Sequence, residues 1–212
     1  FFGPPGTSKT HFARAIAARL QWWYVEISPS DLLADGEDRM GHNLKRLFAE
    51  TRDLEETVVF IDEFEEIAAK RDNASRRDKS ITNEFLKQVP LFRREKRKNL
   101  LVCATNYIRE LDAALIRPGR FDCIIPVGDL DHNSRSLIFR HFLARTNHVA
   151  VDVDEVVSTL SLFTPADIEY LFHKVSQHAF EREYREGRNF DITTSTFKEI
   201  IKECQPSLTV EN

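Results

Sequence analysis

The chain contains little cysteine and no long apolar run, and both deficits limit the class of protein to which it can belong. Its three cysteines, Cys103, Cys123 and Cys204, are widely spaced and form no C-x-x-C pair, so we expect reduced thiols and an intracellular, cytoplasmic location. No window approaches the roughly 20 consecutive apolar residues of a transmembrane helix, and no charged segment followed by a hydrophobic one opens the chain. The sequence therefore predicts a soluble protein with no membrane partner.

The chain also lacks a strong excess of charge, internal repeats and low-complexity segments. Its 30 Lys and Arg residues against 34 Asp and Glu residues give a formal net charge of −4. This balance argues against a surface built as a whole for nucleic acid, and it leaves room for a local basic groove. An initiating Met is absent and only two residues precede Gly3, from which we expect a fragment without its natural N-terminal part.

Apolar runs alternate with helical periods in the first part of the chain. We expect strands at 22–28, 57–62, 99–106 and 123–127, and helices near 12–20, 44–54, 83–89 and 112–116. The run TVVFID, residues 57 to 62, is typical of a strand that is buried on both faces of a parallel sheet. This alternation predicts an α/β domain over residues 1–128, with a parallel sheet flanked by helices.

The pattern changes after Gly128, where only helical periods follow. They lie near 137–142, 153–160, 168–175 and 197–203. Thr164 and Pro165 are suited to open the third of these helices, because Thr is a common cap and Pro is tolerated in the first turn. The second part of the chain, residues 129–212, is therefore predicted to be a small all-α domain.

The opening stretch FFGPPGTSKT fits the phosphate-binding pattern G-x-x-x-x-G-K-[ST] except at one position, where Ser8 replaces the second glycine. In such a loop the backbone N–H groups hold polyphosphate, Lys9 reaches the β- and γ-phosphates, and the Thr10 hydroxyl binds Mg²⁺. The loop residues are Gly3, Pro4, Pro5, Gly6, Thr7 and Ser8. The alternative is a Pro-Gly turn before an ordinary helix.

Ser8 itself bears on whether the loop works. If the position required a positive φ, a Cβ would cost about 1–2 kcal/mol. Ser is also a preferred residue at the start of a helix, where an ordinary backbone suffices. We expect that the site needs a small side chain there and not a left-handed backbone.

Polar residues end two of the predicted strands. Asp62 is suited to hold Mg²⁺ and Glu63 to deprotonate the attacking water, while Asn106 could bind the γ-phosphate or that water. The carboxyl ends of parallel strands meet at one edge of the sheet, and ligands bind at that edge. The alternative for Asp62 and Glu63 is that these carboxylates only solvate a turn, as we expect Glu65 and Glu66 to do. The alternative for Asn106 is that it only ends a strand.

The stretch ALIRPGRFD places Arg117 and Arg120 three residues apart across a rigid Pro-Gly turn. A turn that presents two guanidiniums outward suits the phosphate charge of a neighbouring subunit, as an arginine finger acting in trans. A solvated basic turn is the alternative.

Together GPPGTSKT, VVFIDE, ATN and LIRPGRFD resemble the Walker A, Walker B, sensor 1 and arginine-finger motifs of AAA+ ATPases, in that order. TPADIEYL and TTSTFKEIIKECQPSLT resemble the opening of the family's lid helix and its C-terminal helix, so nearly the whole chain is covered. The resemblance implies a P-loop nucleotide domain with a helical lid, ATP and Mg²⁺, and a homo-oligomeric ring, usually of six.

In the lid motif only Ala166 and Asp167 match, because Pro165 replaces the first Gly, and the resemblance implies that Ala166 contacts nucleotide. Relatives carry a nucleotide-contacting His where Phe142 stands here, next to His141; neither residue is assigned.

The family uses ATP hydrolysis to act on a protein or a nucleic acid. Protein-unfolding members project an aromatic residue into the pore, where this chain has Gly36 followed by Glu37 and Asp38; a shifted alignment brings Met40-Gly41 forward, and Met could grip varied side chains. The basic runs 70–79 and 93–98 motivate a nucleic-acid client, with ordinary solvated loops as the alternative interpretation. We expect a protein client, with a nucleic-acid remodeller and an ATP-controlled scaffold that hydrolyses little as alternatives.

Overall fold

The computed structural model describes residues 1–36, 39–68, 76–94, 98–117, 119–146 and 149–209. Contacts divide the chain into two compact units. The first, here the sheet unit, contains Phe1–Gly3 and Lys9–Val127, and the second, the helical unit, contains Pro4–Ser8 and Gly128–Asn212. The predicted phosphate loop is therefore divided, because Pro4–Ser8 belongs to the helical unit while Lys9 and Thr10 belong to the sheet unit.

Three parallel strands form the centre of the sheet unit. They are β1 (Trp23–Ile27), β2 (Thr57–Ile61) and β3 (Asn99–Cys103), in the order β1-β2-β3. Val59 of β2 pairs with Val25 on one side and Leu101 on the other. All five residues of β2 are buried, which confirms the strand predicted from the continuous apolar run.

The first residues of the chain extend the sheet beyond β3. Phe2 forms parallel bridges with Thr105 on one side and with Pro126 on the other. Its N–H donates to the Ile125 carbonyl at 3.1 Å, and its carbonyl accepts from the Val127 N–H at 2.8 Å. The chain therefore begins inside the sheet, between the end of β3 and the segment 125–127.

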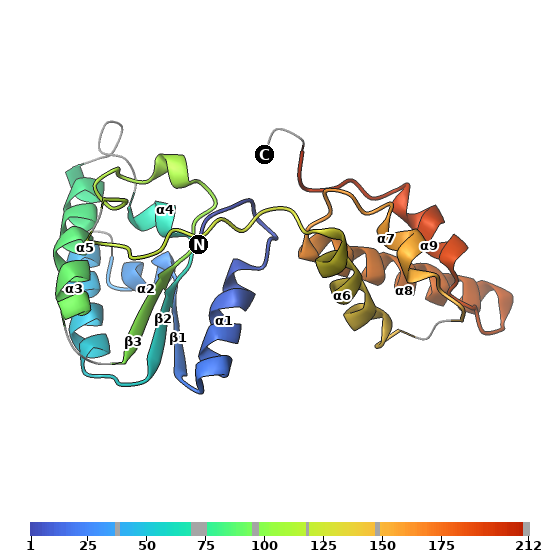
Figure 1. The fold of residues 1–212 in the computed structure, drawn as a ribbon, viewed down its shortest axis with the longest axis horizontal. Coiled ribbons are helices and arrows are strands. Elements are labelled where there is room, and N and C mark those ends of the chain that lie inside the picture. The colour runs from blue at the N-terminus through green and yellow to red at the C-terminus, as the bar shows by residue number, and fades with distance from the viewer. Residues whose placement is uncertain (37–38, 69–75, 95–97, 118, 147–148, 210–212) are drawn as a thin grey trace. The chain divides into compact units, whose positions relative to one another are not determined.

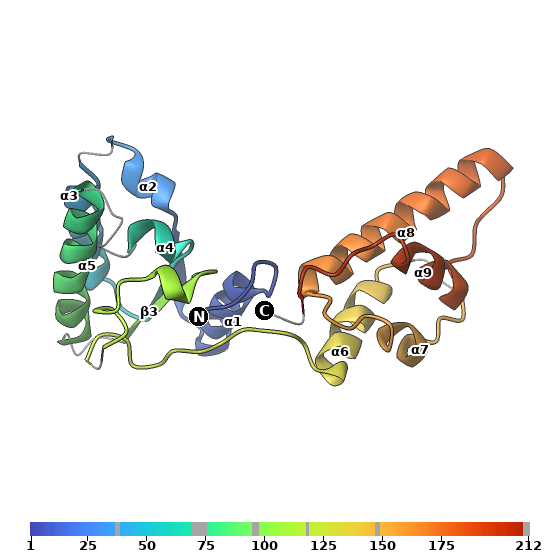
Figure 2. The same cartoon turned by 90° about the horizontal axis from the view of Figure 1, so that it is seen from above.

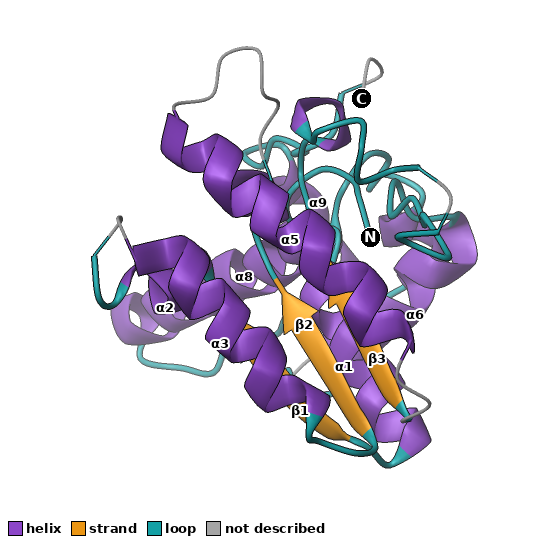
Figure 3. Ribbon diagram, turned by 90° about the vertical axis from the view of Figure 1, so that its left-hand side faces the viewer, coloured by secondary structure: helices purple, strands orange, loops and turns teal. Residues whose placement is uncertain are grey.

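Helices cover both faces of this sheet, as Figures 1 and 3 show. They are α1 (Lys9–Leu20), α2 (Pro29–Leu33), α3 (Met40–Arg52), α4 (Phe64–Ile67) and α5 (Arg76–Arg94), with a 3-10 turn η2 at Ile108–Glu110. In Figure 3, α3 and α5 cross one face of the strands and α1 lies behind them. The α/β fold predicted from the sequence is confirmed.

Alternate residues of β2 point into two separate cores, as the period of a strand requires. Val58 and Phe60 pack with Ala13 of α1 on one face. On the other face Ile61 belongs to a larger core that contains Phe85 of α5. Burial on both faces explains why the run carries no charged residue before Asp62.

The helical unit consists of α6 (His132–Leu143), α7 (Val153–Val157), α8 (Pro165–Glu186) and α9 (Thr194–Ile201), shown from above in Figure 2. Three rings hold its core, because the centroid of Phe139 lies 4.8 Å from that of Phe172 and 5.1 Å from that of Phe197. Among the described helices, including the 22-residue α8, none has the apolar stretch needed to span a bilayer.

Two predicted elements of the sheet unit do not form. Residues 112–116 make turns instead of a helix, in which the Asp112 side chain accepts the Ala114 N–H at 2.8 Å and the Asp112 carbonyl accepts the Leu115 N–H at 2.9 Å. Residues 123–127 contribute only the bridge at Pro126, a residue that has no N–H to donate to a strand ladder.

Candidate nucleotide site

Lys9 lies in the first turn of α1, and its side chain is withdrawn from solvent. Only 7% of the residue is exposed. Its Nζ donates to the carbonyl of Gly3 and to Oδ1 of Asn106, both at 2.8 Å. Burial lowers the pKa of the Lys9 ammonium, while the carboxylates of Asp62 and Glu65 oppose that shift. A cation is thus held at the end of β3, beside the residue predicted to sense the γ-phosphate.

The next residue, Thr10, meets the acidic end of β2. Its hydroxyl donates to Oδ2 of Asp62 at 3.0 Å, although 52 positions separate the two residues. Hydroxyl and carboxylate oxygens are the ligands that Mg²⁺ prefers, and it usually takes one or two from the protein and the rest from phosphates and water. The donor set fits Mg²⁺ on this ground. Within the described ranges, no three His, Cys, Asp or Glu residues group to hold a metal by themselves.

Glu63 follows Asp62 in an unusual backbone conformation. It precedes α4 in the left-handed region, with φ 47° and ψ 44°, and its N–H donates to Oδ1 of Asp62 at 3.0 Å. A left-handed residue that is not glycine is uncommon and typically marks a turn or a functional site. The sharp turn leaves the Glu63 side chain exposed next to the Asp62 carboxylate.

Glu65 has a role that the sequence did not reveal. Its Oε1 accepts the backbone N–H of Asn106 at 3.1 Å, while its Oε2 is buried without a hydrogen-bond partner among the described residues. The expectation that Glu65 only solvates the turn is therefore wrong, whereas Glu66 is exposed. The partner of Glu65 is a backbone group 41 residues away, and such a pairing leaves no local pattern in the sequence.

The rest of the loop, Pro4–Ser8, packs in the helical unit. Thr7 is 2% exposed, and its hydroxyl donates to the Pro4 carbonyl at 2.9 Å, which closes the turn. Gly6 adopts φ 77° and Ser8 adopts φ 67°. The expectation that Ser8 has an ordinary helix-start backbone is therefore wrong, because the missing glycine leaves a residue with a Cβ in the left-handed region.

Replacing Ser8 should change stability in a definite order. Ser8→Gly is expected to raise the free energy of unfolding by up to about 1 kcal/mol. Gly removes the strain of a left-handed Ser, and this gain exceeds the free energy lost because Gly gives the unfolded chain more conformational freedom. Ser8→Val is expected to lower it, because a β-branched residue fits a positive φ worst. Urea denaturation of the two variants and the wild type measures this order.

A matched control is Ser176→Gly, at an exposed position inside α8. There Gly should lower the free energy of unfolding, since a regular helix gives it no strain to relieve. If Ser8→Gly destabilised the protein as much as Ser176→Gly, the strain assigned to Ser8 would be absent.

Gly6 lies against the first turn of α8. A Cβ on Gly6 would come within 3.0 Å of the Thr164 hydroxyl and 3.2 Å of the Ala166 Cβ. The Ala166 N–H donates to the Gly6 carbonyl at 3.4 Å. The loop and the residue that the lid motif assigns to nucleotide are therefore adjacent in the helical unit.

Residues 1–129 match the profile of the ATPase family associated with various cellular activities, abbreviated AAA. The chain belongs to this family. The match to the AAA family agrees with the observed parallel sheet. As a member of this family, the chain is an ATPase domain with the AAA P-loop fold.

Curated relatives are similar over almost the whole AAA chain. The cell division cycle protein 48 homolog of Archaeoglobus fulgidus is 29% identical over 97% of the chain and 30% of its own length. The proteasome-activating nucleotidase of Methanococcus vannielii is 29% identical, over 94% of the chain and 49% of its own length. A probable 26S proteasome regulatory subunit 10B of Caenorhabditis elegans is 31% identical over 95% of the chain and 50% of its own length. The chain thus spans half or less of these relatives.

The two arginines of the AAA domain are placed differently. Arg117 is exposed, as expected. Arg120 is half-buried and donates from Nη1 to the Ala114 carbonyl. The expectation that both guanidiniums point outward is therefore wrong for Arg120 in the single chain.

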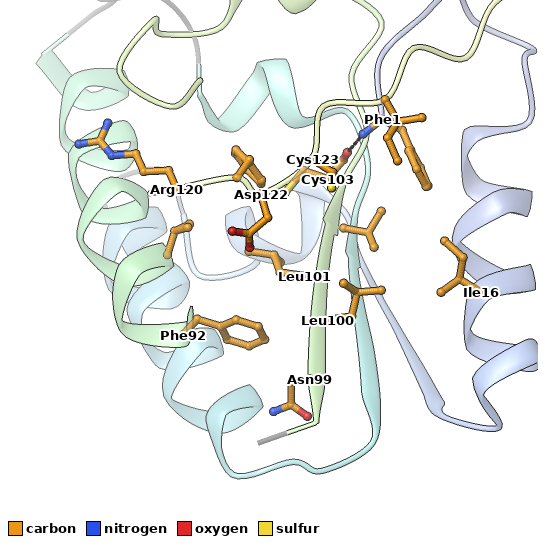
Figure 4. Close-up of a pocket in the computed structure, with 14 residues that line it drawn as sticks. Phe1, Ile16, Phe92, Asn99, Leu100, Leu101, Cys103, Arg120, Asp122 and Cys123 are labelled. Carbon is orange, nitrogen blue, oxygen red and sulfur yellow. Dashed lines mark hydrogen bonds between the residues drawn. The ribbon is translucent and has the colours of Figure 1, made fainter. Parts of the chain in front are cut away.

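A cavity of about 480 Å³ lies beside β3 (Figure 4). It runs along the strand, with Phe1 near one end and Asn99 near the other, and Arg120 and Asp122 also line it. Lys9, Thr10, Asp62 and Glu63 are not among its lining residues. The cavity belongs to the edge of β3 and not to the groups predicted to bind nucleotide.

The described part of the segment predicted to contact a client does not place the expected gripping residue on the surface. Gly36 is exposed with φ 94°, and Glu37 and Asp38 lie outside the described residues. Met40 is only 6% exposed and packs in the core with Leu44. The interpretation of Met40 as a pore-facing gripper is therefore wrong, because its side chain already fills the core.

The remaining features singled out from the sequence are the two basic runs and the pair His141 and Phe142. The basic runs 70–79 and 93–98 lie largely outside the described residues, and Lys98 forms an exposed ion pair with Glu56 at 3.0 Å, an arrangement that contributes little energy. In α6, Phe142 packs on Phe172 with centroids 5.6 Å apart, while its neighbour His141 is exposed.

Proposed function

We propose that the AAA chain is the ATP-binding and ATP-hydrolysing domain of a ring-shaped motor that remodels a protein client. The observation that carries this proposal is the convergence of Lys9, Thr10, Asp62 and Asn106 at the carboxyl ends of β2 and β3. Two direct hydrogen bonds, Lys9 to Asn106 and Thr10 to Asp62, join residues 97 and 52 positions apart. A Pro-Gly turn before an ordinary helix would require neither.

Binding of ATP is assigned to the loop and the first turn of α1. The backbone N–H groups of Gly6–Thr10 would hold the phosphates, with the positive end of the α1 dipole behind them. Lys9 would exchange its contact with Asn106 or Gly3 for phosphate oxygens. Thr10 and Asp62 would hold Mg²⁺, which supplies neutralisation of phosphate charge when bound. Ala166, beside Gly6, would contact the nucleotide from the lid.

Hydrolysis is assigned to the exposed carboxylate of Glu63. This group would accept a proton from water as the water oxygen bonds to the γ-phosphorus and the bond to the bridging oxygen breaks, releasing ADP. Asn106 would orient the water or the γ-phosphate through its amide, and Glu65 would hold the Asn106 backbone in place. The left-handed turn at Glu63 leaves its side chain exposed, so that water can reach the carboxylate.

The arginines are proposed to act across a subunit boundary. Arg117 is exposed and free to reach a neighbour's phosphates as a finger in trans. Arg120 would have to leave the Ala114 carbonyl before it could do the same. This assignment predicts that turnover depends on assembly.

A protein client is favoured because two of the relatives carry the proteasome in their names. A nucleic-acid client rests on the two basic runs alone. A scaffold that binds ATP with little hydrolysis rests on the strained Ser8.

The decisive experiment measures ATP turnover and particle size of the full-length protein with and without ATP. We expect steady turnover, a larger particle in ATP, and faster turnover when an unfolded polypeptide is added. Stimulation by DNA or RNA, lost steeply as salt rises, would favour the nucleic-acid alternative. Binding and assembly with ATP without any turnover would favour the scaffold and contradict the proposed enzyme.

A further inference from the structure

The C-terminal part of the helical unit returns to the first turn of α8. The Ser207 N–H donates to Oδ2 of Asp167 at 3.0 Å, and its hydroxyl donates to Oδ1 at 2.5 Å. Leu208, the next residue, is only 4% exposed and anchors the segment. We call residues 205–208 the tail. Its two hydrogen bonds to Asp167 join positions 40 residues apart.

The same carboxylate caps α8. Thr164 donates to Oδ2 of Asp167 twice, from its N–H at 2.8 Å and from its hydroxyl at 2.9 Å. In return the Asp167 N–H donates to the Thr164 hydroxyl at 3.2 Å. Asp167 therefore accepts four hydrogen bonds from two segments, and bonds to an ionised acceptor are stronger than neutral ones.

This first turn is also the surface on which the phosphate loop rests. A Cβ on Gly6 would press against the Thr164 hydroxyl and the Ala166 Cβ, and the Ala166 N–H donates to the Gly6 carbonyl. Thr164 is 1% exposed, so water does not replace these contacts. A continuous series of contacts thus runs from Ser207 through Asp167 and Thr164 to Gly6, within the helical unit.

We propose that Asp167 is a positioning residue for the phosphate loop and that Ser207 of the tail holds it in place. The tail then controls how tightly the loop binds the phosphates of ATP, although neither Ser207 nor Asp167 touches the nucleotide. The first turn of a helix leaves backbone N–H groups without partners and frays when its cap is lost. A frayed turn would free Gly6, and the loop would have to be reordered whenever nucleotide binds.

This inference rests on the proposed function, and the test separates the two. The full-length protein and its variants are titrated with a fluorescent ATP analogue, and KM and kcat for ATP are measured beside the melting temperature. Asp167→Ala is expected to raise Kd and KM about tenfold, and Ser207→Ala about threefold, with kcat changed much less. Such a split indicates lost binding and not a damaged catalytic group.

The matched control is Asp152→Ala. Asp152 caps α7 by accepting the Glu155 N–H at 3.0 Å, in the same unit but without a contact to the loop among the described hydrogen bonds. It should lower the melting temperature without changing Kd. Equal Kd values for Ser207→Ala and wild type, or an equal rise in Kd for Asp152→Ala, would overturn the positioning role. A wild-type protein that binds no ATP would overturn the proposed function as well.

Discussion

Replacing Glu63 by Gln is expected to reduce steady ATP turnover about 100-fold or more while ATP still binds. The amide has the size of the carboxylate but cannot take the proton of the attacking water. Lys9, Thr10 and Asp62, which are assigned to binding, keep their contacts in this variant. The measurement is steady-state phosphate release together with the Kd of an ATP analogue.

The control for this variant is Glu66→Gln. Glu66 is also exposed, lies three residues later on α4, and has no assigned role. Its substitution removes the same charge from the same surface and should leave turnover near the wild-type value. Comparable losses in both variants would assign the effect to surface charge and remove Glu63 as the base.

Gly3→Ala is expected to have the largest effect on folding. A Cβ on Gly3 would lie 1.9 Å from the Val127 carbonyl oxygen, and the residue has φ 153°. Because the obstacle is backbone, the strand pairing of residues 1–3 must shift, at a cost of about 3 kcal/mol. For a chain of this size that loss lowers the melting temperature by roughly 6–12 °C, which thermal unfolding followed by circular dichroism would detect.

Gly128→Ala is the matched control, because it follows Val127 directly. A Cβ on Gly128 meets nothing within 4 Å, and its φ is not positive. The change should leave the melting temperature unaltered or raise it slightly, since Ala restricts the unfolded chain more than Gly does. A Gly3→Ala protein as stable as Gly128→Ala would mean that the chain start is not fixed in the sheet.

Periodicity predicted most of the fold, because buried strands and amphipathic helices leave repeating apolar positions. The strands at 22–28, 57–62 and 99–106 and the four later helices all form, with ends shifted by a few residues. The helix at 112–116 did not form because so short a segment cannot be continued past Arg117, which precedes Pro118 and is disfavoured in a helical conformation, an effect that apolar spacing does not record. Conversely, the positive φ of Ser8 depends on the path of the loop and not on the helix that follows it.

The candidate site, like the fold, could be predicted only in part. Lys9, Thr10, Asp62 and Asn106 could be chosen from motif spacing, and the structure places them in contact. The contact of Glu65 with Asn106 could not be predicted, because its partner is a backbone N–H, which every residue except proline carries. The prediction for Met40 was wrong because a flexible Met side chain suits both a gripping loop and a core. Only the packing of the folded chain decides between these two roles.

The pairing of residues 1–3 between Thr105 and Pro126 makes two parts of the sheet unit depend on each other. Phe1 donates from its N-terminus to the Cys103 carbonyl at 2.7 Å, at one end of the cavity along β3. Residues 1–3 therefore connect the end of β3 to the segment 125–127, because Phe1 and Gly3 bond to the backbone of Thr105 while Phe2 bonds to Ile125 and Val127. A change that displaced Phe2 would reach both neighbours, since backbone groups on each side would lose their partners.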